Sequence, residues 1–176
     1  MTSKGTTSRD ETNELLFERA SKSWDEGRLL SAFRLFMAGA KAGDTGAQFN
    51  LGYFYAAGIG VKRNKRRAVF WYQRAYRKGF AAAASNIAAL FLAEADMRGA
   101  LKWYHRAITL HDADANLAVA KIYVRDGRNF AEIEPYLRRA IEAPPDEITQ
   151  AARKEAELIL RSPGKPRSSR KAKLKA

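Results

Sequence analysis

The chain has 176 residues, with 32 Lys and Arg against 19 Asp and Glu, a net charge of +13, and no Cys. The lack of cysteine excludes a disulfide framework, a thiolate nucleophile and any Cys-ligated metal site. No apolar run approaches the length of about 18 residues that a membrane span needs, and the N-terminal segment MTSKGTTSRD lacks the apolar stretch of a secretory signal. We therefore expect a soluble, cytoplasmic protein with a substantial core.

The excess positive charge is confined to two segments. Residues 45–93 contain eight basic and no acidic residues, and residues 162–176 contain six basic and no acidic residues. Residues 1–44 are neutral, with seven groups of each sign, and residues 94–161 carry a net charge of −1. The two basic segments therefore need separate explanations.

Residues 1–9 show no apolar periodicity, and we expect them to be disordered. Beyond them the sequence repeats. A small or aliphatic residue, followed three and four positions later by large apolar residues, occurs at Ala32, Ala68, Ala100 and Ile133, at spacings of 36, 32 and 33 residues. Within these blocks the apolar residues recur at i, i+3, i+4 and i+7, which is one stripe of a helix. Trp71, in the second block, is expected to be a core residue.

A second repeated block precedes the first one in each unit. It has the pattern A-x-x-x-apolar-small-x-x-aromatic and begins at Ala47, Ala83 and Ala115. Each unit is therefore predicted to be two antiparallel helices, and the fold class is predicted to be all-α, with no strands. The expected repeats cover about residues 13–46, 47–82, 83–114 and 115–143.

The turn inside the second repeat has residues suited to its conformation. Gly58 and Gly60 supply the positive φ angles that end one helix and reverse the chain. Asn64 is a plausible N-cap for the following helix.

The C-terminal part is predicted to contain one capping helix and a tail. Pro145, Asp146 and Glu147 predict the start of a helix over residues 145–161, which would cover the exposed face of the last repeat. The helical repeat domain thus spans residues 10–161. Residues 162–176 are predicted to be a disordered tail that attracts polyanions or only keeps the chain soluble; its basic residues are Lys165, Arg167, Arg170, Lys171, Lys173 and Lys175.

Residues 47–79, AQFNLGYFYAAGIGVKRNKRRAVFWYQRAYRKG, carry a family resemblance. They closely resemble a Sel-one-like repeat, whose pattern is A-x-x-x-L-G-x-x-Y-x-x-G-x-G-V followed by K-A-x-x-W-Y-x-x-A-A-x-x-G. The third unit lacks the G-x-G turn, and the first is more similar to the related tetratricopeptide repeat. The resemblance covers about residues 13–142. It implies a short right-handed superhelical α-solenoid that acts as a protein-interaction scaffold or adaptor and not as an enzyme.

The residues needed for catalysis are sparse. The two histidines are His105, predicted to face solvent, and His111, predicted to lie at a helix end. The sequence His111-Asp112-Ala113-Asp114 lacks a third partner for a metal ion, and no Gly-rich phosphate loop is present. We therefore expect no catalytic residues, no metal, no cofactor and no small-molecule substrate.

The first candidate binding surface is a basic patch on the second repeat. Helical spacing at 100° per residue separates most of its members from the Ala68, Trp71 and Tyr72 face, and cations at a helix start have no acidic residue among residues 45–93 to compensate them. The patch either binds anions around an aromatic anchor or is a solvated outer face. Its members are Lys62, Arg63, Lys65, Arg66, Arg67, Phe70, Arg74, Arg77 and Lys78.

The second candidate surface is the concave groove that the resemblance implies. First helices line this groove in tetratricopeptide-like arrays. Phe49 and Tyr53 lie one turn apart and off the core stripe, so we expect them to anchor a peptide or helix unless a neighbouring repeat covers them. The groove positions are Phe17, Ser21, Trp24, Phe49, Tyr53, Ser85, Ala89, Leu117 and Lys121.

Three functions remain open at this point. The preferred one is an adaptor that holds an acidic or amphipathic protein or peptide partner in the groove. The second is binding of nucleic acid or another polyanion through the basic patch and the tail. The third is an immunity protein that neutralises a toxin, which needs only a complementary surface.

Overall fold

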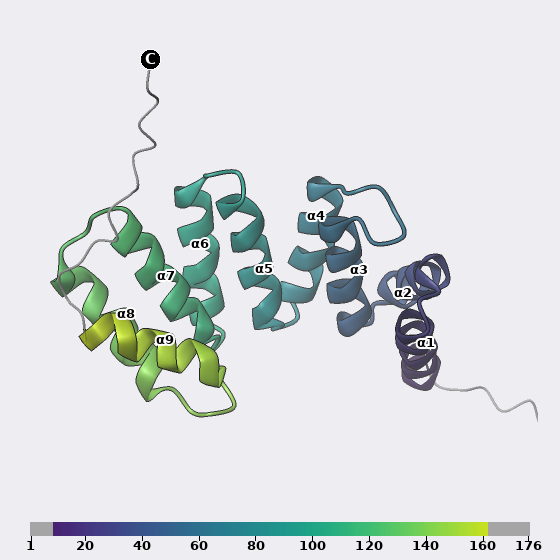
Figure 1. Cartoon of the computed structure of the whole chain (residues 1–176). Helices are drawn as coiled ribbons and strands as arrows, with labels where there is room; N and C mark the ends of the chain where they lie inside the picture. The colour runs from purple at the N-terminus through teal and green to yellow at the C-terminus, as the bar shows by residue number, and fades with distance from the viewer. Residues whose placement is uncertain (1–8, 162–176) are drawn as a thin grey trace, which may run out of the picture. The chain divides into compact units, whose positions relative to one another are not determined.

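The computed structural model describes residues 9–161, which form nine α-helices and no strand (Figure 1). The all-α fold class predicted from the repeats is therefore confirmed. The predicted disorder of residues 1–9 concerns residues that lie almost entirely outside the described range. The helices are α1 (Arg9–Asp25), α2 (Leu29–Ala42), α3 (Thr45–Ala57), α4 (Lys65–Tyr76), α5 (Ala81–Leu92), α6 (Met97–Ile108), α7 (Asp114–Arg125), α8 (Phe130–Glu142) and α9 (Gln150–Arg161).

The helices pack within two compact units, Met1–Trp103 and Tyr104–Ala176, whose boundary falls inside α6. In the first unit α2 contacts both α1 and α3, and α4 contacts both α3 and α5. In the second unit α7, α8 and α9 all contact one another. Within each unit, short connections join the helices that follow each other in the chain. None of the helices in residues 9–161 is long and apolar enough to span a membrane.

Small residues let the helices of the first unit approach closely. Ala32, Ala68 and Ala75 are completely buried among large side chains such as Leu51 and Tyr72. Gly52 shows how tight the packing is, because a Cβ atom placed there would lie 2.6 Å from the Tyr72 ring. The alternation of small and large residues in the sequence is thus the packing pattern of the core.

Two aromatic residues are buried to a different extent from that expected. Phe54 is completely buried and meets Trp24, Phe33 and Phe36, although the predicted core stripe of its helix did not include it. Trp71, which the sequence places in the core, is only half-buried. Phe54 is buried because α3 packs against α2 on one side and α4 on the other, so the buried face of α3 is wider than a single stripe.

The turn between α3 and α4 has the predicted conformation. Gly58 and Gly60 have φ angles of 77° and 63°, and Gly58 is the left-handed residue that ends α3. The Asn64 side chain caps α4 by accepting a hydrogen bond from the Arg67 backbone N–H at 3.0 Å. A Cβ atom at Gly60 would lie 3.1 Å from the carbonyl carbon of Leu29, so this turn is also packed closely against the start of α2.

The C-terminal helix begins later than the sequence predicts. It starts at Gln150 and not at Pro145, so Asp146 and Glu147 lie outside its first turn. The delay follows from a tertiary contact. Thr149 donates hydrogen bonds from its backbone N–H and its hydroxyl to Oδ1 of Asp114, at 3.1 and 3.3 Å, and its hydroxyl oxygen accepts one from the Ala152 N–H.

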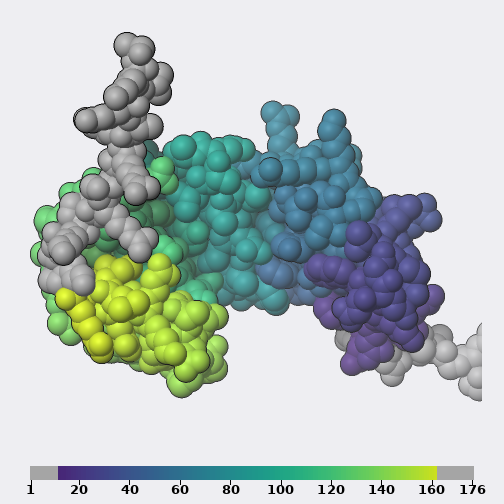
Figure 2. Space-filling model, viewed as in Figure 1, coloured from purple at the N-terminus to yellow at the C-terminus, as the bar shows by residue number. Residues whose placement is uncertain are grey.

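The last helix covers the second unit. In the space-filling view the yellow-green atoms of α9 lie over the green surface of its own unit (Figure 2). Ala156 of α9 is completely buried in a core cluster with Leu117 of α7 and Leu137 of α8. Arg153 adds polar contacts, because its guanidinium donates hydrogen bonds to the carbonyl oxygens of Ile141 and Ala143, both at 2.6 Å.

Candidate functional site: an aromatic face on the first helices

Seven of the predicted groove residues lie on the first helices of the repeats in the first unit. We call this surface the first-helix face, and its residues are Phe17, Ser21 and Trp24 on α1, Phe49 and Tyr53 on α3, and Ser85 and Ala89 on α5. Aromatic contacts connect these helices in turn. The Trp24 and Tyr53 rings are stacked, with centroids 5.7 Å apart and planes at 29°, and the centroids of Phe49 and Phe80 are 4.7 Å apart.

Trp24 and Tyr53 form a rigid pair at the surface. The Trp24 indole also meets the Phe36 and Phe54 rings edge-on, at 6.1 and 5.0 Å, which fixes it against the core. Tyr53 lies on its outer side and keeps 41% of its surface exposed. Tyr53 therefore presents an aromatic ring to solvent from a fixed position, with little conformational entropy left to lose on binding.

Phe49 is more deeply packed than expected. The sequence suggests that nothing in its own helix pair buries it, but its ring lies 5.6 Å from that of Tyr72 on α4 and it is half-buried. Burial raises the pKa of the Tyr72 hydroxyl, which also accepts a hydrogen bond from the Asn86 side chain at 3.3 Å. Phe49 is thus part of the packing within its own repeat as well as of the surface.

Phe80 extends the first-helix face, although no helical pattern in the sequence indicates it. It is the N-cap residue of α5, lies in the turn between two repeats and is 37% exposed. Residues in such turns have no helical periodicity, so the only available signal was a large apolar side chain where a polar cap is usual. At the other end of the face, Phe17 is half-buried against Phe36, with ring centroids 5.7 Å apart.

The two predicted groove positions in the second unit differ in exposure. Leu117 is buried in the core cluster that includes Ala156 of α9, so it does not line an open groove. The Lys121 amine forms an ion pair with Glu155 of α9 at 2.8 Å, but 51% of the Lys121 side chain stays exposed. The place of Lys121 in the groove therefore stays a prediction.

Comparison with known families identifies the repeats. The model of the Sel1 repeat matches residues 45–80 and 82–112, which contain α3 with α4 and α5 with α6. The chain contains two Sel1 repeats. The first of them is the segment that carried the resemblance in sequence.

Solved structures of Sel1 repeat proteins have a similar fold. A Sel1 repeat protein from Oxalobacter formigenes is 24% identical with a TM-score of 0.64, over 81% of this chain and 60% of its own length. A protective antigen of uropathogenic Escherichia coli with an SLR fold is 15% identical with a TM-score of 0.67, over 89% of this chain and 35% of its own length. The chain thus spans less than two thirds of either protein. No curated protein matches the sequence.

An immunity protein of Pseudomonas aeruginosa is also among the matched structures. It is 14% identical over 92% of this chain and 86% of its own length, but the TM-score is 0.39. A superposition of this quality does not establish a shared arrangement. The immunity hypothesis therefore gains nothing from it.

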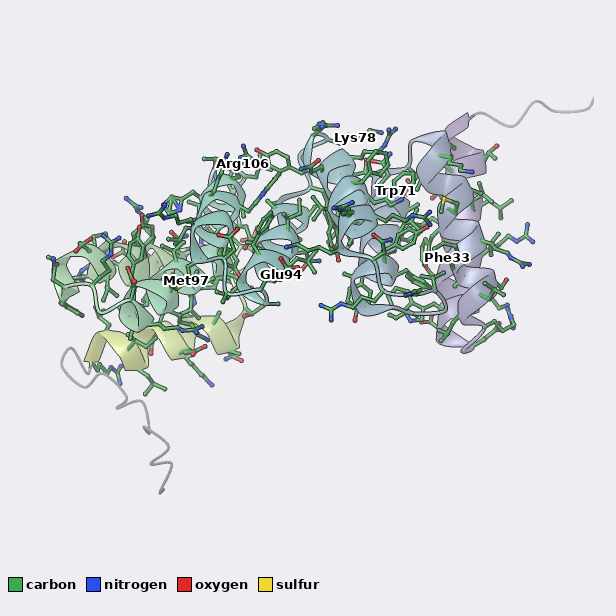
Figure 3. All side chains as sticks on the ribbon, turned by 90° about the horizontal axis from the view of Figure 1, so that it is seen from above. Phe33, Trp71, Lys78, Glu94, Met97 and Arg106 are labelled. Carbon is green, nitrogen blue, oxygen red and sulfur yellow. The ribbon has the colours of Figure 1, made fainter. Side chains whose placement is uncertain are left out.

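Two of the cations in the basic patch on the first Sel1 repeat make contacts within the fold. Lys65, expected to lack a compensating acid, forms an ion pair with Glu94 at 2.5 Å, and its amine lies 4.2 Å from the Phe91 ring centroid. Lys78 donates a hydrogen bond to the carbonyl of Gly43, where α2 ends. In Figure 3, Lys78 and Glu94 lie apart from each other. These two cations therefore help to join neighbouring repeats.

The other cations of the basic patch are exposed. Within residues 9–161 no ion pair is formed by Lys62, Arg63, Arg66, Arg67, Arg74 or Arg77. Phe70 is 51% exposed beside them, with its ring edge-on to Trp71 at 5.0 Å and the Arg74 guanidinium 5.9 Å from its centroid. The basic tail residues, Lys165 to Lys175, lie outside the described part of the chain.

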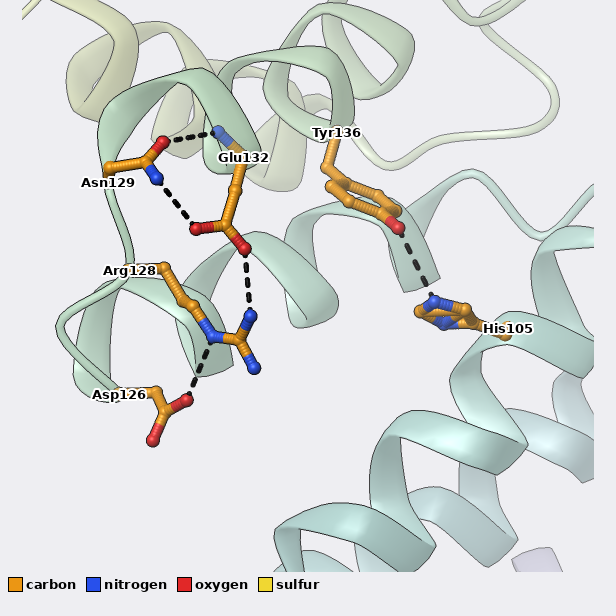
Figure 4. Close-up of polar contacts among 6 residues, drawn as sticks. All are labelled: His105, Asp126, Arg128, Asn129, Glu132 and Tyr136. Atoms are coloured by element: carbon orange, nitrogen blue, oxygen red, sulfur yellow. Dashed lines mark hydrogen bonds and ion pairs between the residues drawn. The ribbon is translucent and has the colours of Figure 1, made fainter.

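Of the two histidines, His105 lies on α6 and His111 follows the end of that helix. His105 is exposed, as predicted, and its Nε2 lies 3.3 Å from the Tyr136 hydroxyl (Figure 4). In a separate cluster in the same figure, hydrogen bonds from Arg128 to Glu132 and Asp126 raise the pKa of the Arg128 guanidinium. His111 ends its repeat with a φ angle of 63°, in the position that Gly79 occupies in the preceding repeat.

The acidic residues that follow His111 serve as helix contacts. Oδ1 of Asp112 accepts a hydrogen bond from the Ala115 N–H at 3.3 Å, and Asp114 accepts those from Thr149. Among the described residues no group of three His, Asp or Glu side chains is arranged to hold a metal ion.

Proposed function

We propose that this chain is a non-catalytic interaction scaffold that binds an amphipathic, acidic protein segment on the first-helix face of α1, α3 and α5. The observation that carries the proposal is the stacked Trp24–Tyr53 pair, whose outer ring is exposed while its inner ring is fixed by the core. Aromatic side chains held in place in this way are typical anchors of protein interfaces.

The expected partner follows from the apolarity and charge of this unit. Covering Tyr53 and Phe80 requires an apolar group on the partner, since both rings are exposed. The first Sel1 repeat and the start of the second carry eight basic and no acidic residues over positions 45–93. This local excess attracts acidic segments and speeds their association. An amphipathic helix or peptide with acidic residues combines both properties.

A second candidate function is polyanion binding through the basic patch. The observation that favours it is the exposed Phe70 ring beside Arg74, a combination that suits stacking of a base next to a phosphate. Lys65 and Lys78 contribute less to it than the sequence suggests, because both are engaged within the fold.

The first experiment compares two exposed aromatic residues on different helices. Tyr53→Ala removes the outer ring of the first-helix face, and Phe70→Ala removes a similarly exposed ring from α4. Partners captured from nuclease-treated lysate would be purified, and their affinity for each variant measured at two ionic strengths. We expect Tyr53→Ala to weaken binding by about 2 kcal/mol, or roughly thirtyfold, at both ionic strengths, because apolar burial is not screened by salt.

The control variant decides between the two functions. Phe70→Ala should leave the affinity of the protein partner almost unchanged, and circular dichroism should show both variants folded. A large, salt-sensitive loss of affinity in Phe70→Ala, together with normal binding in Tyr53→Ala, would show that the partner binds at the basic patch. Phe49→Ala is less suited to this test than the sequence suggests, because it also removes packing against Tyr72.

A further inference from the structure

The turn between α3 and α4 borders an open pocket that is separate from the first-helix face. The pocket has a volume of about 640 Å³. Residues of α2, the end of α3, the turn and the start of α4 border it. The lining residues are Phe33, Met37, Tyr55, Val61, Lys62, Arg63, Asn64 and Arg67. They include three cations and no acid.

The apolar wall of the pocket is held in place by the core. Phe33 meets the Tyr55 ring edge-on, with centroids 5.5 Å apart and planes at 89°, and it also contacts the buried Phe54 at 6.3 Å. Tyr55 is buried, whereas Phe33, Met37 and Val61 are half-buried. These half-buried side chains can therefore cover an apolar group of a ligand without rearrangement.

Arg67 is fixed at the edge of this wall. Its Nη1 donates a hydrogen bond to the Tyr55 hydroxyl at 3.2 Å, and its guanidinium carbon lies 5.4 Å from the centroid of the same ring. No ion pair involves Arg67 within residues 9–161. The remaining guanidinium N–H groups are thus held ready for an anion, in the planar arrangement that matches a carboxylate.

The glycine turn fixes the other side of the pocket. A Cβ atom at Gly58 would lie 3.3 Å from Cβ of Arg63, and one at Gly60 would lie 3.1 Å from the carbonyl carbon of Leu29. The two glycines therefore let the turn fold back on itself and against α2. This packing places Lys62 and Arg63 at the pocket that Phe33 and Met37 also line.

We propose that this pocket binds a carboxylate of a protein partner, an Asp or Glu side chain or a chain end, that lies next to an apolar side chain. The three cations supply the charge complementarity, and no acid lines the pocket to compete. The apolar wall favours a peptide over a bare phosphate chain, because a phosphate leaves that wall uncovered. This site does not depend on the first-helix face, so it stands or falls independently of the function proposed above.

The test uses small probes and the methionine signals. The chain has only three methionines, so the Met37 methyl group is readily assigned in a proton–carbon NMR spectrum. Acetyl-Leu-Glu with an amidated C-terminus, whose only charge is the Glu carboxylate, should shift the Met37 and Val61 methyl signals in a saturable way. Acetyl-Leu-Gln, amidated in the same way and therefore uncharged, and inorganic phosphate, which lacks the apolar group, should each bind at least about fivefold more weakly. Phosphate binding as tight as that of acetyl-Leu-Glu would overturn the proposal in favour of a polyanion site.

Substitutions that each remove one positive charge show where the probe binds. Arg63→Gln and Arg67→Gln should each raise the dissociation constant of acetyl-Leu-Glu at least about threefold, since each removes a charge-assisted contact. Arg74→Gln removes the same charge outside the pocket and should leave it within about twofold. Arg63 is exposed, so its variant remains informative even if Arg67→Gln perturbs the fold. Equal effects of Arg63→Gln and Arg74→Gln would show general electrostatics only, whereas Tyr53→Ala should not alter probe binding.

Discussion

At the scale of single residues, Phe54 and Trp71 show how neighbouring helices change the burial of a side chain and its contribution to stability. Phe54 is completely buried and contacts aromatic rings from both α1 and α2. Trp71 occupies the position that the repeat pattern assigns to the core, yet it is half-buried and touches the exposed Phe70. Burial, and not residue size, decides the cost of removing either ring.

We therefore expect Phe54→Ala to destabilise the protein more than Trp71→Ala. Phe54→Ala should cost about 3–5 kcal/mol, because it removes a large side chain and leaves a cavity in a close-packed core. Trp71→Ala should cost clearly less, since part of its ring already contacts water. Chemical denaturation of both variants measures the difference. An equal or larger loss in Trp71→Ala would mean that the burial of these two rings has been assigned wrongly.

At the scale of elements, α9 depends on contacts that lie far from it in sequence. Its start is set by the hydrogen bonds between Thr149 and Asp114, which lie 35 residues apart. Its position along α8 is set by Arg153, which binds two carbonyl groups near the end of that helix. Those carbonyls have no partner within their own helix, so the guanidinium satisfies them.

Removing this contact should loosen α9 without unfolding the repeats. We expect Arg153→Gln to speed amide hydrogen exchange over residues 150–161 and to cost about 1–3 kcal/mol, since two hydrogen bonds from a charged donor disappear. Lys154→Gln removes a neighbouring, exposed charge and serves as the matched control. Exchange in α9 that is unchanged in Arg153→Gln, or equally fast in both variants, would contradict the role of Arg153.

At the scale of the whole molecule, polyanion binding can depend either on the net charge alone or on where the positive charges lie. The two cases predict different results for variants of equal net charge. If the basic patch binds polyanions, replacing Arg66, Arg74 and Arg77 by Gln should lower the salt concentration that elutes the protein from a heparin column. The slope of log K against log salt should also decrease by about one for each cation that no longer neutralises an anionic group of the polymer.

The matched control replaces three exposed cations elsewhere, Arg98, Lys102 and Arg125, by Gln. It has the same net charge and should elute later than the patch variant. Equal elution of the two variants would show that retention reflects net charge alone. Deletion of residues 162–176 measures the contribution of the basic tail to heparin retention separately. Unchanged retention after the deletion would show that the tail does not contribute.

Features that depend on local spacing could be predicted from the residue pattern alone. The 3.6-residue stripes predicted the helices and their pairing, and the positive φ angles of Gly58 and Gly60 and the Asn64 cap followed from residue types at a turn. Such features are decided within one or two helical turns, so a single repeat contains the necessary information.

Which surfaces stay open depends instead on contacts between residues that are far apart in the chain. Lys65 pairs with Glu94, 29 residues away, and Lys121 pairs with Glu155 on α9, so two predicted binding residues serve the fold. Phe80 joined the first-helix face, and Phe33 joined Arg67 around a pocket, through contacts between different repeats. The physical reason is that a helical repeat fixes its own backbone locally, whereas the exposure and pairing of a side chain depend on what the neighbouring repeat places against it.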